Sequence, residues 1–297
     1  MAREEVSFTS GGELCAASLF RPEGAEGPAP CVVLGTGFSC VRDQGLDVFG
    51  ERFADAGFAA LAFDYRYFGG SGGEPRSLVN SAHQRDDMRA ALAFSRSLDW
   101  VDSSRIALWG YSLGGGHVQY LAATEPGVAA AICIAPVVND TRTILHIGGF
   151  SHLARLTVAG AKDTLRALRR AEPYRIPAVG PPGGLAAISS AEAVAGMAAI
   201  TPPGSTWRNE FCARAVLGIS YSLERKVRKI TCPTLYCITE QDDVNPPKLG
   251  KQAARRVPDG ELRLYPGGHF EVRQGETFER MVADQVDFLG RRLRAGA

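Results

Sequence analysis

A serine between two glycines occupies a position that is typical of a catalytic nucleophile. An apolar, strand-like run at 105–109 leads into Gly110-Tyr-Ser112-Leu-Gly114, and a helix-like segment follows. This pattern predicts a nucleophile elbow, a tight strand-to-helix turn that exposes the Ser112 hydroxyl, although the bare motif also fits an ordinary glycine-rich turn. Gly110 and Gly114 suit the elbow because a Cβ at either position would crowd it. The backbone N–H of Leu113 then lies at a helix N-terminus, where it is free to bind an oxyanion.

A serine nucleophile needs a base and an acid that orients the base, and both are expected at strand ends late in the chain. The last strand-like run is followed by Pro-Gly-Gly-His269, so His269 is the predicted base. The run at 234–238 is followed by two acids. Asp242 is preferred because it is the fourth residue past the last apolar residue of that strand. Asp243 and Asp140 remain alternatives, since the acid needs only to reach the imidazole in space.

A second glycine-rich strand end could complete an oxyanion hole. The strand at 31–34 runs into Gly35-Thr-Gly-Phe38, and the backbone N–H of Phe38 is the predicted second donor. A plain tight turn is the alternative. Neither these glycines nor those at 69–73 match a phosphate-binding motif, so no cofactor is expected. The seven cysteines show no metal-binding spacing, which predicts reduced structural thiols and no metal site.

The elements that must position these residues alternate between strand and helix. This alternation predicts an α/β fold with a mostly parallel sheet of about eight strands, an opening antiparallel hairpin, and helices on both faces. The rhythm changes at 139–228, which contains helical patches, a Pro/Gly-rich loop and no clear buried strand. We therefore expect a core formed by 1–138 and 229–297, with 139–228 inserted as a helical cap over the carboxyl ends of the strands. The helical patches of this cap are expected at 151–170, 191–198 and 210–217.

The cap is expected to decide which substrate enters. Phe150 and Trp207 are the predicted pocket walls in the cap, because large aromatic side chains suit apolar ligand sites, and Tyr111 is the predicted wall beside the serine. The alternative is that most apolar residues of the cap simply pack it onto the core.

Composition excludes several classes of function. The net charge of +1 over 297 residues provides no field that would attract nucleic acid or an acidic membrane surface. The longest apolar run, 128–138, contains Pro136 and is too short to span a bilayer. The first residues carry two acids and no apolar segment, so no secretory signal is expected and a cytoplasmic protein is predicted. The sequence leaves open whether the chain forms a homodimer.

Five stretches resemble the α/β-hydrolase superfamily, in its serine esterase and peptidase branch. They are 32–38, 63–75, 110–114, Pro233-Thr-Leu with Asp242, and Pro266-Gly-Gly-His269, and they cover the core but not the cap. The 63–75 loop is similar to that of bacterial acyl-ester hydrolases, dipeptidyl-peptidase-like proteins and polyketide transferases. There the resemblance implies that Asp64 and Arg66 hold the loop as a pair. Thr36-Gly37 stands where this superfamily usually has His-Gly, but a backbone donor does not depend on that side chain.

Together the residues and the resemblance predict a serine hydrolase that cleaves a small or medium carboxylic ester. An acyltransferase, a thioesterase or a carbon–carbon bond hydrolase would use the same triad, and a peptidase is a weaker alternative. A ligand-binding protein on a hydrolase scaffold is the non-enzyme alternative. The choice among these substrates rests on analogy, because a fold does not determine a function.

Overall fold

An eight-stranded sheet forms the centre of the computed structural model, which describes residues 1–24, 27–218 and 221–294. Its spatial order is β1-β2-β4-β3-β5-β6-β11-β12. The opening hairpin of β1 (Ala2–Ser10) and β2 (Glu13–Arg21) is antiparallel, and β2 also pairs antiparallel with β4 (Ala59–Phe63). Every other pairing in this sheet is parallel. The remaining strands are β3 (Ala29–Gly35), β5 (Val101–Tyr111), β6 (Ala130–Ile134), β11 (Thr234–Thr239) and β12 (Gly260–Tyr265).

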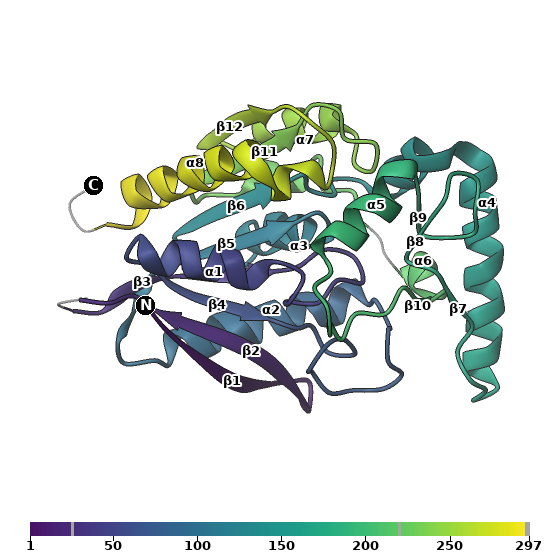
Figure 1. Ribbon diagram of the computed structural model, residues 1–297, viewed down its shortest axis with the longest axis horizontal. Helices are drawn as coiled ribbons and strands as arrows, with labels where there is room; N and C mark the ends of the chain where they lie inside the picture. The colour runs from purple at the N-terminus through teal and green to yellow at the C-terminus, as the bar shows by residue number, and fades with distance from the viewer. Residues whose placement is uncertain (25–26, 219–220, 295–297) are drawn as a thin grey trace.

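Helices cover both faces of the sheet (Figure 1). α1 (Leu46–Asp55) and α8 (Gly275–Leu293) lie on one face, and α2 (Ser81–Arg96), α3 (Leu113–Ala122) and α7 (Pro247–Ala254) on the other. The strand β3 shows why: Val32 and Leu34 pack with the first group, whereas Cys31 and Val33 pack with the second. A strand that is apolar on both sides requires such double cover. The predicted α/β architecture is confirmed.

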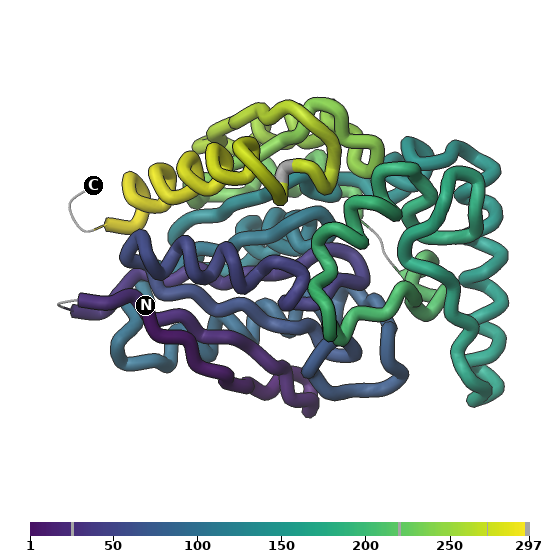
Figure 2. The backbone as a smooth tube through the Cα atoms, viewed as in Figure 1, coloured from purple at the N-terminus to yellow at the C-terminus, as the bar shows by residue number. Residues whose placement is uncertain are grey.

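The segment between β6 and β11 lies at the carboxyl ends of the parallel strands, at the opposite end of the molecule from the N-terminus and the last turn of α8 (Figures 1 and 2). Its largest helix is α4 (Asp140–Leu168), which begins where the Asn139 side chain accepts a hydrogen bond from the Arg142 N–H. α4 bends at Gly148 and Gly149, and the positive φ of 66° at Gly149 suits glycine. A second helix, α5 (Ala191–Ile200), follows later in the same segment.

Two details of this segment differ from the sequence prediction. No strand was expected, but β7 (Arg175–Ile176) pairs with β10 (Phe211–Cys212), and β8 (Val179–Gly180) pairs with β9 (Ile188–Ser189). The helical patch expected at 210–217 is reduced to α6 (Ala215–Gly218), because β10 uses the first of those residues as a strand. Two-residue strands are too short to produce a detectable alternation of apolar and polar residues. Short 3-10 turns at Lys226–Lys229 and Glu271–Arg273 complete the fold.

The 63–75 loop is held by Asp64 and Arg66, but not as the pair that the resemblance implied. The carboxylate of Asp64 accepts hydrogen bonds from the backbone N–H groups of Arg42 (2.8 Å) and Gly70 (3.0 Å). The guanidinium of Arg66 instead forms an ion pair with Asp87 at 2.7 Å. The expected Asp64–Arg66 pair is therefore wrong, because each side chain is held by different partners.

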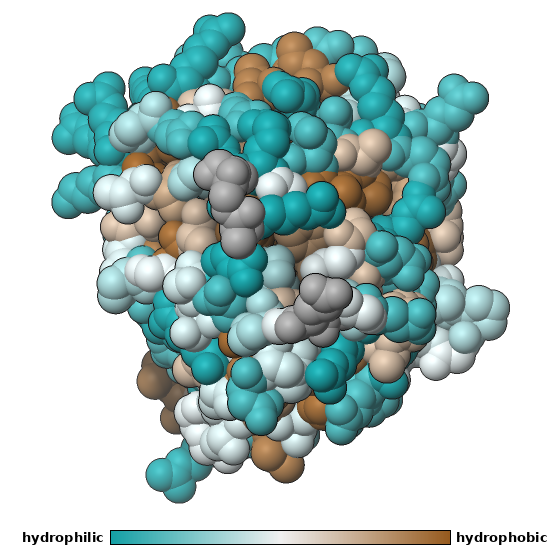
Figure 3. Space-filling model, turned by 90° about the vertical axis from the view of Figure 1, so that its left-hand side faces the viewer, coloured by the Kyte–Doolittle hydropathy of each residue, from teal (hydrophilic) through white to brown (hydrophobic). Residues whose placement is uncertain are grey.

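The surface at the end opposite α4 is mostly hydrophilic, with apolar spots between the polar residues (Figure 3). None of the described helices combines the length and the hydropathy needed to cross a bilayer.

All seven cysteines are buried. Burial raises the pKa of the Cys31 and Cys237 thiols to about 12, which keeps them protonated and unreactive at neutral pH.

Candidate active site

Ser112 lies at the turn between β5 and α3, with a φ of 56° and a ψ of −116°. A non-glycine residue rarely adopts a positive φ, so the surrounding backbone must hold the turn in place. A Cβ on Gly110 would lie 2.3 Å from the Gly114 carbonyl oxygen, and a Cβ on Gly114 would lie 2.5 Å from the carbonyl oxygens of Gly35 and Thr36. Both glycines are therefore needed to bring strand and helix this close, as the sequence indicated.

The structure brings Ser112, His269 and Asp242 together in one chain of hydrogen bonds. The Nε2 atom of His269 lies 3.1 Å from Ser112 Oγ, and its Nδ1 atom lies 2.8 Å from Asp242 Oδ2. All three side chains are at least 95% buried. In this geometry the imidazole can accept the hydroxyl proton at Nε2 while the carboxylate fixes the proton on Nδ1.

The Asp242 carboxylate is held from both of its oxygens. Its Oδ1 accepts the backbone N–H groups of Val244 (2.8 Å) and Asn245 (2.7 Å), and its Oδ2 accepts the Thr239 hydroxyl (3.0 Å) as well as His269. These donors leave the carboxylate one orientation, with Oδ2 toward the imidazole.

The two alternative acids lie elsewhere. Asp243 lies beside Glu192 of α5, and its carboxyl group helps to raise the pKa of Glu192. Asp140 lines the wall of the adjacent pocket, and burial raises the pKa of its carboxyl group. Within the described residues, His, Cys, Asp and Glu side chains form no group of three that could hold a metal ion.

The two predicted oxyanion donors border the same pocket as the serine. Phe38 and Leu113 line it together with Ser112. A Cβ on Gly37 would lie 3.3 Å from the Cβ of Ser112, so the backbone before Phe38 runs directly past the serine. Neither the Phe38 nor the Leu113 N–H has a hydrogen-bond partner in the part of the chain that the structure describes. Both are free to bind a charged oxygen.

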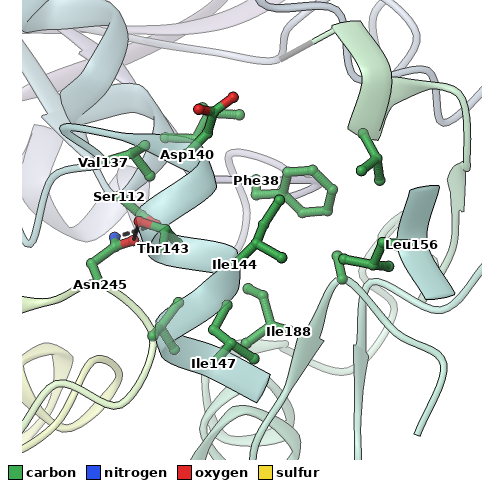
Figure 4. A pocket seen from close by; sticks show the side chains of 14 residues that line it. Phe38, Ser112, Val137, Asp140, Thr143, Ile144, Ile147, Leu156, Ile188 and Asn245 are labelled. Atoms are coloured by element: carbon green, nitrogen blue, oxygen red, sulfur yellow. Dashed lines mark hydrogen bonds between the residues drawn. The ribbon is translucent and has the colours of Figure 1, made fainter. Parts of the chain in front are cut away.

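The pocket next to Ser112 is apolar along most of its wall (Figure 4). Leu156 lies across the cavity from the serine, and Asp140, Thr143 and Asn245 are its polar members. The apolar side chains around it come from both the strand ends and the segment between β6 and β11: Phe38, Leu113, Val137, Ile144, Ile147, Leu156, Ala187, Ile188, Val216 and Val244.

The pocket walls predicted from sequence need correction. Phe150 is 80% exposed, because it directly follows the bend of α4 and points away from the core. Trp207 lines a different, more polar hollow that it shares with Arg76 and Tyr67. Tyr111 is buried behind His269, and its hydroxyl donates to the His269 carbonyl oxygen. None of the three lines the pocket beside the serine.

Sequence reasoning missed two residues that contact the catalytic loops. The side-chain amide of Asn245 donates to Ser112 Oγ at 3.3 Å and to the Ala135 carbonyl oxygen at 2.7 Å. The carboxylate of Glu192, on α5, accepts the N–H of Phe270 at 2.6 Å. Burial raises the pKa of Glu192 to about 7, and the neighbouring carboxyl of Asp243 adds to this shift. No local pattern marks either residue, although Asn245 lies three positions after the predicted acid.

Comparison with known proteins shows the family of this chain. Residues 31–274 match the family described as serine aminopeptidase, S33. The quorum-quenching protein AidA of Acinetobacter baumannii is 38% identical, over 97% of this chain and 94% of its own. The polyketide transferase grgF of Penicillium sp. is 26% identical, over 99% and 98%. The thiohydrolase apmlB of Arthrinium phaeospermum is 36% identical over a shorter region, 45% of this chain and 44% of its own.

The fold agrees as well. The crystal structure of the α/β-hydrolase GrgF from Penicillium sp. superposes with a TM-score of 0.85 at 25% identity, covering 99% of both chains. The family match spans most of the chain, including all three residues of the hydrogen-bonded Ser112–His269–Asp242 set. The chain belongs to the α/β-hydrolase superfamily, in the family described as serine aminopeptidase, S33.

Proposed function

We propose that this chain is a serine hydrolase that cleaves a small or medium carboxylic ester through an acyl-enzyme on Ser112. The observation that carries the proposal is the buried hydrogen-bond chain from Ser112 through His269 to Asp242, which opens onto an apolar pocket. Such a pocket suits an apolar acyl chain, whose burial contributes binding free energy.

The reaction proceeds in two halves. Ser112 Oγ attacks the acyl carbon while His269 Nε2 takes the hydroxyl proton, and the amides of Phe38 and Leu113 bind the oxyanion. The carbon–oxygen bond to the alcohol then breaks, and the imidazolium gives its proton to that alcohol. A water molecule, deprotonated by His269, attacks the acyl-enzyme next. The bond to Ser112 Oγ breaks, Oγ recovers a proton from His269, and the carboxylic acid leaves.

Transfer of the acyl group to an acceptor other than water is the second candidate. It is supported by the relative named polyketide transferase. The relative named thiohydrolase suggests instead a thioester donor for the same acyl-enzyme, with water still the acceptor. The acyl-enzyme on Ser112 would be the same, and the two candidates differ in the acceptor and in how well the pocket excludes water.

A fluorophosphonate probe tests the nucleophile. Wild-type protein is expected to be labelled once per chain, and Ser112→Ala is expected to give no labelling. Nitrophenyl esters of increasing acyl length then measure the substrate preference, with an optimum set by the apolar pocket. Folded wild-type protein that resists labelling, or a Ser112→Ala variant that retains ester turnover within tenfold of wild type, would reject the proposal and favour a binding protein on this scaffold.

A further inference from the structure

Asn245 occupies a place in the site that the Ser-His-Asp set does not explain. It follows β11 in the loop that carries Asp242, and its side chain is 4% exposed. Its Nδ2 atom donates to Ala135 O at 2.7 Å and to Ser112 Oγ at 3.3 Å. Its Oδ1 atom accepts the hydroxyl of Thr143, on α4, at 3.2 Å.

These contacts fix which end of the amide faces the serine. If the amide were turned over, Oδ1 would face the Ala135 carbonyl oxygen, and two acceptors would repel each other. In the observed orientation the Thr143 hydroxyl donates to Oδ1 and adds to the preference set by the Ala135 carbonyl oxygen, which can only accept. The neighbours therefore hold an N–H donor, rather than an acceptor, toward Ser112 Oγ.

Ser112 Oγ carries developing negative charge twice in the reaction. It gains charge when it loses its proton to His269 and attacks the acyl carbon. It gains charge again when the acyl-enzyme breaks down and Oγ is the leaving atom. A preorganised donor that faces this atom stabilises both transition states, because its dipole is already aligned when the charge appears.

We propose that Asn245 is a further catalytic residue, whose amide donates to Ser112 Oγ as that atom becomes charged, and that Thr143 is a positioning residue that orients the amide. This inference rests on the proposed function, since it needs Ser112 to be the nucleophile. It gives the Thr143 hydroxyl, on α4 in the segment between β6 and β11, a role in the reaction at Ser112.

The expected effect is moderate. Loss of one donor from an oxyanion hole costs on the order of 10² to 10³ in kcat. The hydrogen bond from Asn245 Nδ2 to Ser112 Oγ is long, at 3.3 Å, and the same nitrogen also donates to Ala135 O. We therefore expect a smaller loss, of about tenfold, for Asn245→Ala. Thr143→Val removes the orienting hydrogen bond, nearly keeps the shape of this part of the pocket wall, and is expected to cost about threefold.

The experiment compares Asn245→Ala, Asn245→Asp and Thr143→Val. It measures the second-order rate of fluorophosphonate labelling and the steady-state hydrolysis of one nitrophenyl ester. Asn245→Ala is expected to slow labelling and kcat about tenfold, with KM within about twofold of wild type. Asn245→Asp is nearly isosteric but places a carboxylate beside the charged oxygen, so at pH 9 it is expected to be slower than Asn245→Ala. A residue that merely fills space would give the opposite order, because Asp preserves the packing better than Ala does.

The positioning role has its own readout. In the Asn245→Ala background, Thr143→Val is expected to have no further effect on labelling, because the amide that it orients is gone. Melting temperature and the final extent of labelling show that each variant is folded.

Asn245→Ala within twofold of wild type, or Asn245→Asp as fast as Asn245→Ala at pH 9, would overturn the catalytic role. A full threefold loss from Thr143→Val in the Asn245→Ala background would overturn the positioning role. These outcomes are distinct from failure of the proposed function, in which wild type itself is not labelled at Ser112.

Discussion

Replacing Asp242 with asparagine should invert the tautomer of His269. The Oδ1 position of Asp242 faces two backbone N–H donors, from Val244 and Asn245, and only an oxygen is tolerated there. An asparagine must therefore place its NH₂ group at the Oδ2 position, 2.8 Å from His269 Nδ1. To avoid two facing donors, the imidazole must carry its proton on Nε2 instead. That proton then points at Ser112 Oγ, and the imidazole can no longer accept the hydroxyl proton.

Under the proposed function, Asp242→Asn should thus lower kcat/KM for a nitrophenyl ester by about 10⁴, the loss that the wrong tautomer causes in a Ser-His-Asp hydrolase. Fluorophosphonate labelling should slow in parallel, while the melting temperature changes little because the shape of the side chain is kept. Asp243→Asn is the matched control, since that carboxyl group faces Glu192, and it should stay within about threefold of wild type. An Asp242→Asn enzyme that retained more than a tenth of wild-type kcat/KM would refute the tautomer argument.

Three further predictions follow from packing and charge. Gly114→Ala should lower the free energy of unfolding in urea by about 3 kcal/mol, because its Cβ would meet two carbonyl oxygens at 2.5 Å. Gly27→Ala is the control and should be neutral, because no atom lies within 4 Å of its Cβ position. Leu156→Trp should shift the ester optimum to shorter acyl chains because it fills the far wall of the pocket, and Phe150→Ala should leave the optimum unchanged. Burial raises the pKa of Glu192 in the folded state from an ordinary 4.5 to about 7. Between these two pH values the folded state keeps a proton that the unfolded state has lost, so the free energy of unfolding should fall as pH rises through this range. Glu192→Gln should flatten this dependence and raise the melting temperature at pH 8 by about 2 °C; an unchanged pH profile would contradict the assignment.

The glycines and the order of the chain made the core predictable. Gly110 and Gly114 allow the strand and the helix to approach closely, so the spacing of these two glycines around Ser112 was enough to predict the elbow. Asp242 and His269 follow β11 and β12, which are parallel neighbours in the sheet, so the carboxyl ends of these two strands must lie side by side. The predictions that Ser112, Asp242 and His269 lie together agree with the geometry, while their chemical roles stay predictions for the experiments above.

The pocket could not be derived in the same way. Phe150 was expected to line it because it is large and apolar, but the bend of α4 at Gly148 and Gly149 turns this side chain outward. Which apolar residue of a cap faces inward depends on how the cap docks, and no sequence period records that. Asn245 was missed for a related reason: its partners come from Ser112, Ala135 and Thr143, which are distant in sequence.

The seven buried thiols make a practical difference to how the acyl donor can be identified. Ellman's reagent reacts with thiolates, and protonated thiols inside a folded core do not reach it. In a mixture of folded protein, a thioester and this dye, the colour should come from the thiol that the substrate releases. Denaturing the same sample would add seven further equivalents per chain. One absorbance trace can therefore separate thioester turnover from loss of the fold.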